Sequence, residues 1–253
     1  MESTAELAVA RAIATMRENL GEPLTVDDLA RAALFSKFHF SRVFQRVTGV
    51  SPGRFLSAMR LQQAKRLLVS TSLNVADISV RVGYSSVGTF SSRFSRSVGL
   101  SPTAYRRLGG FTAQMKVEEA VPQDCPASGT LEGRVWQRQG MRRSPIFIGL
   151  FADRIPQGRP VRCTALDHPG PYRLDRVPEG EWFVLSQCAT CTAAGEPIEE
   201  AGLAVATTGP ITVEPTGVVQ AVDIRLKPAG PLEPPVVLSL LDVRRALAGP
   251  IAA

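Results

Sequence analysis

A segment repeated fifty residues apart constrains this chain more than any other feature. Residues 44–52, FQRVTGVSP, align without a gap on residues 94–102, FSRSVGLSP. The same offset pairs Ser36 with Ser86, Phe40 with Phe90 and Ser41 with Ser91. Such self-similarity indicates one supersecondary unit that occurs twice. We therefore expect a small domain that contains two copies of this unit.

Each copy has the pattern of a helix, a tight turn and a second helix. The apolar positions of the second copy recur at helical and not at strand spacing: Ile78, Val82, Phe90, Phe94 and Val98. Gly83 marks the turn, Gly99 marks the end of the second helix, and Ser101-Pro102 begins a new one. A second helix with a polar, Arg-bearing outer face is typical of a DNA-reading helix-turn-helix.

The second copy ends in Gly99-x-Ser101-Pro102-x-x-Tyr105-Arg106, preceded by Gly83-Tyr84 and by FSSRF at 90–94. On these residues the chain, over about residues 5–108, resembles the AraC/XylS transcriptional regulators. The resemblance implies two helix-turn-helix motifs joined by a long helix, with double-stranded DNA and RNA polymerase as partners. It favours activation over repression. The family more often places its sensing domain first, so its sugar effectors are not carried over and the effector stays unknown.

The sequence patterns together predict a multidomain α + β protein. We expect a seven-helix DNA-binding domain at 4–108, with helix-turn-helix motifs at about 25–47 and 75–98, and a linker at 109–128. A β-sandwich that senses or assembles should follow at 129–230, and then a C-terminal extension at 231–253 with a short helix over 236–248. The first helix, at about 4–20, should bury Leu7, Ala10, Ile13, Ala14 and Leu20.

The charge is unevenly distributed along the chain. Residues 1–110 hold 15 Lys or Arg against 7 Asp or Glu, a balance of +8, and the remaining residues hold 14 against 16, a balance of −2; together these give the net +6. A basic first half suits a polyanionic partner, whereas the second half needs none. A solvated, Arg-rich surface is the alternative interpretation of the charge alone.

The first recognition helix, at about 36–47, should carry DNA contacts on its outer side. The candidates are Lys37, Phe38, Ser41, Arg42 and Arg46, of which Phe38, Ser41 and Arg42 rest on the resemblance. A guanidinium can bond guanine O6 and N7 together. Arg42 is therefore the candidate for a base contact, with a phosphate contact as the alternative.

The second recognition helix has smaller outer residues. Aligned on the family, its candidate contacts are Ser86, Val87, Gly88, Thr89, Ser91, Ser92, Arg93 and Arg96. Small side chains offer only thymine-methyl contacts and single hydroxyl bonds. We expect this half to supply affinity and the first half to supply more of the specificity. At the turn of the first copy the family usually has Gly, and we predict that Ala33 takes that place with a backbone cost of about 1 kcal/mol if its φ is positive.

From Phe111 onward Gly and Pro become frequent and the apolar period falls to two. The candidate strands are short and close together, which predicts an all-β sandwich: 114–118, 129–136, 146–151, 161–166, 172–174, 181–187, 211–213 and 218–226. The runs PGPYRL at 169–174 and VPEGEW at 177–182 resemble the transthyretin-like, carboxypeptidase regulatory-like domain. Another seven-stranded sandwich is the alternative.

Four cysteines lie in the second half: Cys125, Cys163, Cys188 and Cys191. The Cys188-x-x-Cys191 spacing occurs in zinc and redox sites, but no paired motif supplies the other zinc ligands, and a redox CxxC normally opens a helix. Structural cysteines are the expectation, and a metal- or thiol-sensing regulator is the alternative. No nucleophile–base set or phosphate loop is recognisable, so we expect no enzyme activity, no cofactor and no metal.

Two further expectations concern location and assembly. No run of eighteen apolar residues occurs and the N-terminus is amphipathic, which predicts a cytoplasmic protein without a membrane partner. A monomer with two recognition helices could fill a site, and a dimer is the alternative. A protein-interaction module without sequence-specific DNA binding is the rival function, and it leaves the +8 charge unexplained.

Overall fold

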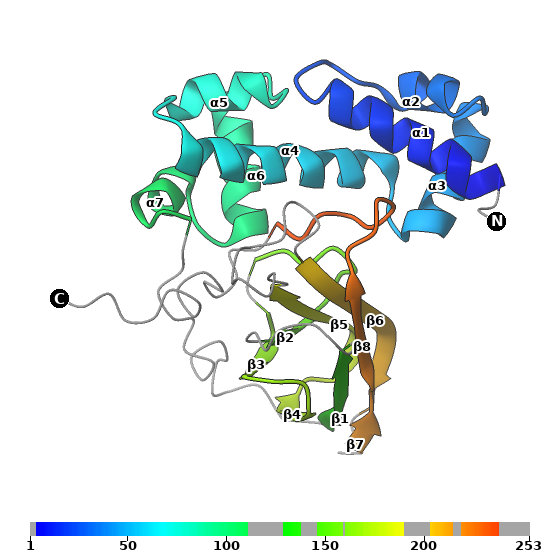
Figure 1. Cartoon of the computed structure of the whole chain (residues 1–253), viewed down its shortest axis with the longest axis vertical. Helices are drawn as coiled ribbons and strands as arrows, with labels where there is room; N and C mark the ends of the chain where they lie inside the picture. The colour runs from blue at the N-terminus through cyan, green and yellow to red at the C-terminus, as the bar shows by residue number, and fades with distance from the viewer. Residues whose placement is uncertain are drawn as a thin grey trace. The chain divides into compact units, whose positions relative to one another are not determined.

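The computed structural model describes residues 4–110, 129–137, 146–158, 160–189, 203–214 and 219–237. The chain divides into two compact units, one of Met1–Gly110 with Gly230–Ser239 and one of Phe111–Ala229 with Leu240–Ala253. The described regular structure is helical in the first unit and β in the second (Figure 1). This confirms the predicted α + β class. The expected linker and strand between 111 and 128 lie outside the described residues.

The described residues of the first unit form seven helices, in the order α1 Thr4–Glu18, α2 Val26–Ala32, α3 Lys37–Thr48, α4 Pro52–Ser70, α5 Val75–Arg81, α6 Val87–Val98 and α7 Pro102–Arg107. The repeated Gly49 and Gly99 end α3 and α6 in the left-handed conformation, with φ of 77° and 89°, which glycine adopts without steric cost. Pro52 and Pro102, each after an N-cap serine, then begin α4 and α7.

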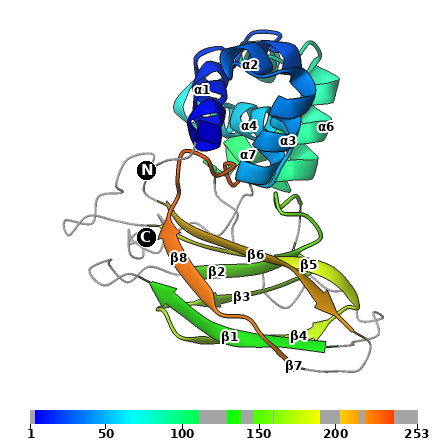
Figure 2. The same cartoon turned by 90° about the vertical axis from the view of Figure 1, so that its right-hand side faces the viewer.

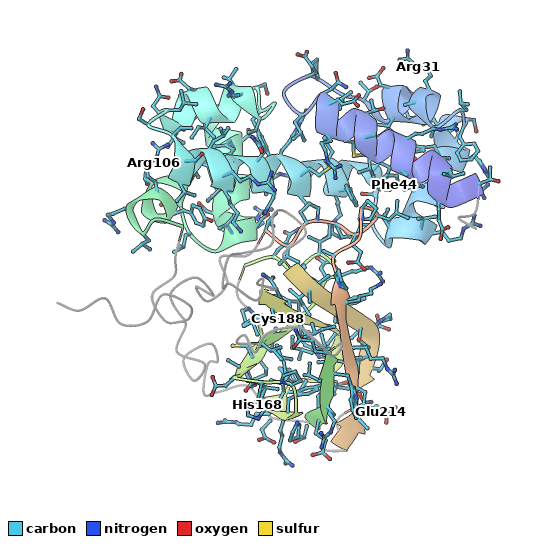
Figure 3. The ribbon with its side chains drawn as sticks, viewed as in Figure 1. Arg31, Phe44, Arg106, His168, Cys188 and Glu214 are labelled. Carbon is cyan, nitrogen blue, oxygen red and sulfur yellow. The ribbon has the colours of Figure 1, made fainter. Side chains whose placement is uncertain are left out.

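The repeat also organises the helical core. The Phe40 ring packs at a tilt against Phe44, and Phe44 packs edge-on against Phe55, with ring centroids 5.4 Å apart in both pairs. Fifty residues later Phe90, Phe94 and Tyr105 repeat this chain of rings at 5.6 Å. Figure 3 labels Phe44 inside the helical unit. Each helix-turn-helix therefore has its own aromatic centre, and α4 contributes to both cores.

The buried face of α1 is not the predicted one. Its buried residues are Ala8, Val9, Ala12, Ile13 and Met16, whereas Leu7 is 46% exposed and Ala14 is exposed. Only Ile13 was assigned correctly to the core. The helix ends at Glu18, so Leu20 lies in the following turn.

The second unit contains strands β1 Gly129–Gln137, β2 Ile146–Phe151, β3 Arg162–Leu166, β4 Pro171–Val177, β5 Gly180–Ala189, β6 Leu203–Val213, β7 Val219–Ala221 and β8 Ile224–Pro228. They form one continuous sheet in the order β3-β2-β5-β6-β8-β1-β4, with β7 paired to β1 (Figure 2). The β1–β7 and β1–β8 pairs are parallel, and the other pairs are antiparallel. The strand predicted over 218–226 is thus divided into β7 and β8.

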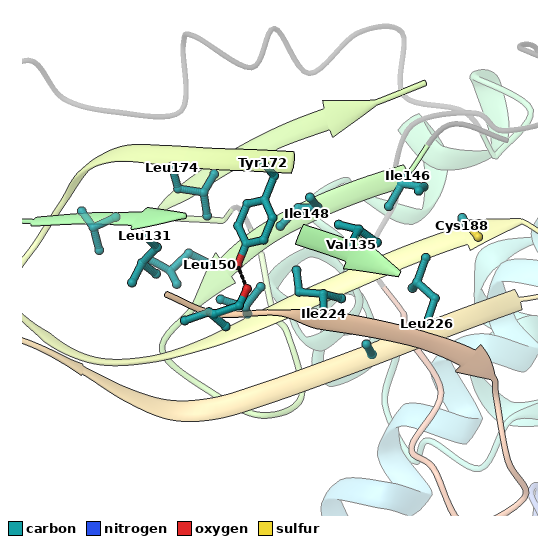
Figure 4. Close-up of a cluster of buried hydrophobic side chains, with 14 of the residues drawn as sticks. Leu131, Val135, Ile146, Ile148, Leu150, Tyr172, Leu174, Cys188, Ile224 and Leu226 are labelled. Carbon is teal, nitrogen blue, oxygen red and sulfur yellow. Dashed lines mark hydrogen bonds between the residues drawn. The ribbon is translucent and has the colours of Figure 1, made fainter. Parts of the chain in front are cut away.

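The division of that strand has a local cause. The Tyr172 hydroxyl donates to the Val222 carbonyl at 2.7 Å in the buried core (Figure 4), and the Asp223 carboxylate accepts from the Arg134 amide at 2.9 Å. A Cβ on Gly133 would lie 2.2 Å from the Val222 carbonyl oxygen. Glycine at 133 therefore allows β1 to lie close to the Val222 carbonyl, in the segment that joins β7 to β8.

The segment that follows β8 returns to the helical unit. Residues 231–237 contain no helix, and the Glu233 amide donates to the Gly230 carbonyl at 3.1 Å in a turn. Val237 is buried among residues of α4, α5, α6 and α7. The predicted helix is thus absent at 236–237, and its remaining residues lie outside the described ones. The described part of the chain contains no helix with the length and hydropathy of a membrane span.

Candidate nucleic-acid interface

The two recognition helices, α3 and α6, lie toward opposite ends of α4 and on the same side of it (Figures 1 and 2). At 1.5 Å per residue, the 19 residues of α4 make it about 28 Å long. Successive major-groove segments on one face of B-DNA are roughly 34 Å apart. The helix that joins the two motifs thus has the length scale of one turn of DNA.

The predicted contact residues of α3 lie at its N-terminal end and along its outer side. Phe38 is 83% exposed, although it is a large apolar residue. Lys37 forms an ion pair with Asp27 of α2 at 2.8 Å. Arg42 and Arg46 are exposed, and no described residue bonds to them. Ser41 is half-buried and its hydroxyl donates to the Lys37 carbonyl at 2.9 Å, so it is the least available of the five.

The predicted contact residues of α6 include those that cap the helix. The Ser86 hydroxyl accepts from the Thr89 amide at 3.2 Å and donates to the Thr89 hydroxyl at 3.2 Å. A Cβ on Gly88 would meet only the Ser86 hydroxyl, at 3.8 Å. Arg93 reaches the Ser57 hydroxyl of α4 at 3.5 Å. The other four are Val87, Ser92 and Arg96, which are exposed, and Ser91, which is half-buried.

The turn between α2 and α3 differs from the prediction. Ala33 has a φ of −79°, and the left-handed residue is Leu34, with a φ of +59°. Leu34 N–H donates to the Arg31 carbonyl, as Gly83 N–H donates to that of Val80. The counterpart of Gly83 is therefore Leu34. The predicted position was wrong by one residue because the second turn is one residue longer than the first, so the offset of fifty does not hold before the turn.

Two carboxylates in the first turn of α2, those of Asp27 and Asp28, carry negative charge near α3. The Thr25 hydroxyl and Asp28 form a capping box at the start of α2, and hydrogen bonds from Thr25, first from its hydroxyl, hold the pKa of Asp28 below its ordinary value. Asp27 in the same turn neutralises Lys37. Arg42, Arg46 and Arg96 are thus the predicted cationic residues that no described side chain pairs.

Two other arginines hold the domain together. The Arg60 side chain of α4 donates to the carbonyls of Leu20, at 2.9 Å, and Glu22, at 2.6 Å, between α1 and α2. Arg106, labelled in Figure 3, donates to the carbonyls of Leu68, at 2.9 Å, and Leu73, at 2.5 Å, around the end of α4. The signature arginine therefore has a structural role. Sequence reasoning missed Arg60, because its partners lie about forty residues away.

The cysteines of the β unit form no recognisable site among the described residues. Cys163 is buried, and burial raises the pKa of its thiol, which disfavours the reactive thiolate. Cys188, near the end of β5, is buried and accepts from the Gln137 amide at 3.7 Å. Within the described part of the chain no group of three metal-binding side chains occurs. Cys125 and Cys191 lie outside it.

Two helix-turn-helix units in one seven-helix domain, each with an exposed recognition helix, define a double helix-turn-helix DNA-binding domain. A protein-family profile described as "Helix-turn-helix domain" matches residues 29–108. The transcriptional activator AarP of Providencia stuartii is 34% identical over 88 residues, which are 35% of this chain and 65% of that protein. The melibiose operon regulatory protein of Escherichia coli K12 is 31% identical over 104 residues, or 41% of this chain and 34% of its own length.

The uncharacterised regulator YbfP of Bacillus subtilis is 32% identical over 155 residues, which are 61% of this chain and 50% of YbfP. That alignment is longer than residues 1–110 and so extends into the β unit. Among solved structures, the DNA-binding domain of AdpA in complex with a target DNA is 35% identical and covers 40% of this chain and 90% of its own, with a TM-score of 0.39. This chain spans less than two thirds of the length of these curated relatives.

Residues 29–108 of the helical half therefore match a helix-turn-helix domain and are similar to transcriptional regulators, which agrees with the AraC/XylS resemblance. The resemblance of the β half to the carboxypeptidase regulatory-like domain stays a prediction.

Proposed function

We propose that this chain is a sequence-specific, DNA-binding transcriptional regulator that reads two successive major-groove segments with α3 and α6. The observation that carries the proposal is the duplicated helix-turn-helix, with both recognition helices exposed on the same side of α4 (Figure 2). The balance of +8 over residues 1–110 supplies attraction to phosphates. Activation is favoured, since AarP is named a transcriptional activator.

The proposal also assigns roles to the β unit, to RNA polymerase and to each recognition helix. RNA polymerase would be the partner in activation, and the β unit would modulate the regulator by binding a ligand or another protein. The division of labour is that α3 supplies more of the base discrimination and α6 more of the affinity. Exposed Phe38 and Arg42 support this for α3, and the small residues Gly88, Thr89 and Ser92 support it for α6.

Selection of binding sites from a random duplex library with the full chain tests the function. One asymmetric motif of about two helical turns should be enriched. Affinity for it should fall steeply with salt, because phosphate contacts release counterions. Absence of any enriched motif would show that sequence-specific regulation is wrong, and an affinity insensitive to salt would favour a protein-interaction module.

Matched arginine variants then test the contacts. Arg46 and Arg96 occupy the same place in the two repeats and are both exposed. Arg46→Ala and Arg96→Ala should each weaken binding to all sequences and lower the salt slope by about one. Arg42→Ala should instead relax the preference at one base pair, by about 1–3 kcal/mol. A uniform loss with Arg42→Ala would assign that residue to a phosphate.

A further inference from the structure

The segment that packs against the core of the second helix-turn-helix comes from the far end of the chain. Residues 230–237, here named the strap, follow the β unit in sequence, yet they belong to the helical unit (orange-red trace in Figure 1). Their sequence is GPLEPPVV. Three of the eight residues are prolines, which fix φ and lack an amide donor. The strap forms no regular strand over 231–237, so the packing of its side chains contributes to holding it in place.

The anchor of the strap is Val237. Its side chain is 1% exposed and belongs to the same buried cluster as residues of α4, α5, α6 and α7. The other buried members are Ala58, Leu61, Ala64, Leu68, Ile78, Val82, Phe90, Phe94, Val98 and Tyr105. Phe90, Phe94 and Val98 form the inner face of the second recognition helix. Val237 is thus part of the packing that fixes α6.

The other end of the strap is tied to the sheet. Strand β8 ends at Pro228, and Ala229 alone separates it from the strap. At its start the strap is closed by a turn, in which the Gly230 amide donates to the Glu233 carboxylate at 3.3 Å and the Glu233 amide to the Gly230 carbonyl at 3.1 Å. The segment between β8 and Val237 is short and contains three prolines. A movement of β8 would therefore be transmitted to Val237 with little slack.

We propose that the strap couples the β unit to the second recognition helix. With Val237 seated, the core behind α6 is filled; with Val237 withdrawn, that core has a cavity, and close-packed cores respond to such a loss by losing stability. A ligand or partner that shifts β8 would therefore change how firmly α6 is held. This proposal rests on the proposed function, because α6 is taken as a DNA-reading helix.

The first arm of the test uses the full chain without DNA. In Val237→Asp, a charge enters the core, and amide hydrogen exchange over 87–98 should quicken at least tenfold while exchange over 26–48 stays unchanged. Val236→Asp places the same charge one residue earlier, on a side chain that is only partly buried, and should change exchange less than twofold. If Val237→Asp unfolds the whole unit, Val237→Ala replaces it, with an expected increase of at least threefold. Wild-type exchange in the Val237 variant, or equal effects of both Asp variants, would overturn the docked strap.

The second arm uses the duplex obtained by site selection. Coupling is reciprocal, so DNA bound to the helical unit should change the exchange of amides 224–228 in β8 at least twofold. Insertion of Gly-Ser-Gly-Ser between Ala229 and Gly230 should abolish this change. No change in the wild type, or a change that survives the insertion, would overturn the coupling. If no duplex is selected at all, the proposed function and the coupling fail together, whereas the first arm still decides whether the strap is docked.

Discussion

At the scale of single residues, Leu34 holds a conformation that glycine holds in the other repeat. A left-handed non-glycine residue carries about 1–2 kcal/mol of strain, and Leu34 is 77% exposed, so its side chain recovers little by packing. Leu34→Gly should relieve this strain, while the greater entropy of unfolded glycine costs roughly 0.5–1 kcal/mol. We expect a net gain of about 0.5–1 kcal/mol in the free energy of unfolding, measured by urea denaturation.

The matched control is Gly83→Ala. A Cβ there would lie 2.5 Å from the Leu20 carbonyl oxygen and 2.6 Å from the Arg60 guanidinium, at a φ of +84°. This variant should lose stability, so the two substitutions should act in opposite directions. A destabilised Leu34→Gly protein would mean that the exposed leucine contributes packing that outweighs its strain.

We expect the exposed Phe38 ring to contact the methyl group of a thymine. A phenyl ring exposed at the start of a recognition helix is suited to contact with the methyl group of thymine. Replacement of each thymine in the selected duplex by uracil, which lacks that methyl, should weaken wild-type binding about fourfold at one position, since one buried methylene is worth about 0.8 kcal/mol. Phe38→Ala should bind the thymine duplex and the uracil-substituted duplex with equal affinity. If that variant keeps the wild-type sensitivity to uracil, another residue contacts the methyl group.

At the scale of elements, the two recognition helices begin differently despite the repeat. The Ser86 hydroxyl caps α6 by accepting from the Thr89 amide, whereas the side chain of Ser36 makes no cap bond at the start of α3. Ser86→Ala should therefore lower the free energy of unfolding by about 1 kcal/mol, and Ser36→Ala by only a few tenths. Urea denaturation of both variants measures the difference. Equal losses would show that the hydroxyl geometry does not decide the stability of these helix starts.

The helices were largely predictable from sequence, because single residues determine where they begin and end: Pro52 begins α4, and Gly49 and Gly99 end α3 and α6. The buried face of α1 was not, since alanine, which gives a weak apolar signal, lies on both the buried and the exposed side of this helix. Most of β6 was missed because Gly209-Pro210 reads as a turn although it lies within the strand. The positions of the candidate interface were predicted from the helical period and the family resemblance. The Asp27–Lys37 pair and the burial of Val237 depend on contacts between separate segments, which no local period encodes.

At the scale of the whole molecule, the chain has one buried cluster around the second helix-turn-helix and another inside the sheet. If each supports its own unit, substitutions in them should lower different unfolding transitions. Tyr172 is 4% exposed, and its hydroxyl donates to the Val222 carbonyl. Burial raises the pKa of Tyr172, so the hydroxyl keeps its proton and remains a donor at neutral pH. Tyr172→Phe leaves that carbonyl without its donor, which costs about 1–3 kcal/mol.

Phe94→Leu is the matched change in the helical core, where Phe94 is fully buried between Phe90 and Tyr105. In a calorimetric scan of the full chain, Tyr172→Phe should lower the midpoint of one transition and Phe94→Leu that of the other. A single transition lowered by both substitutions would mean that the units unfold together. In that case an effector that stabilises the sheet would stabilise the second recognition helix to a similar extent.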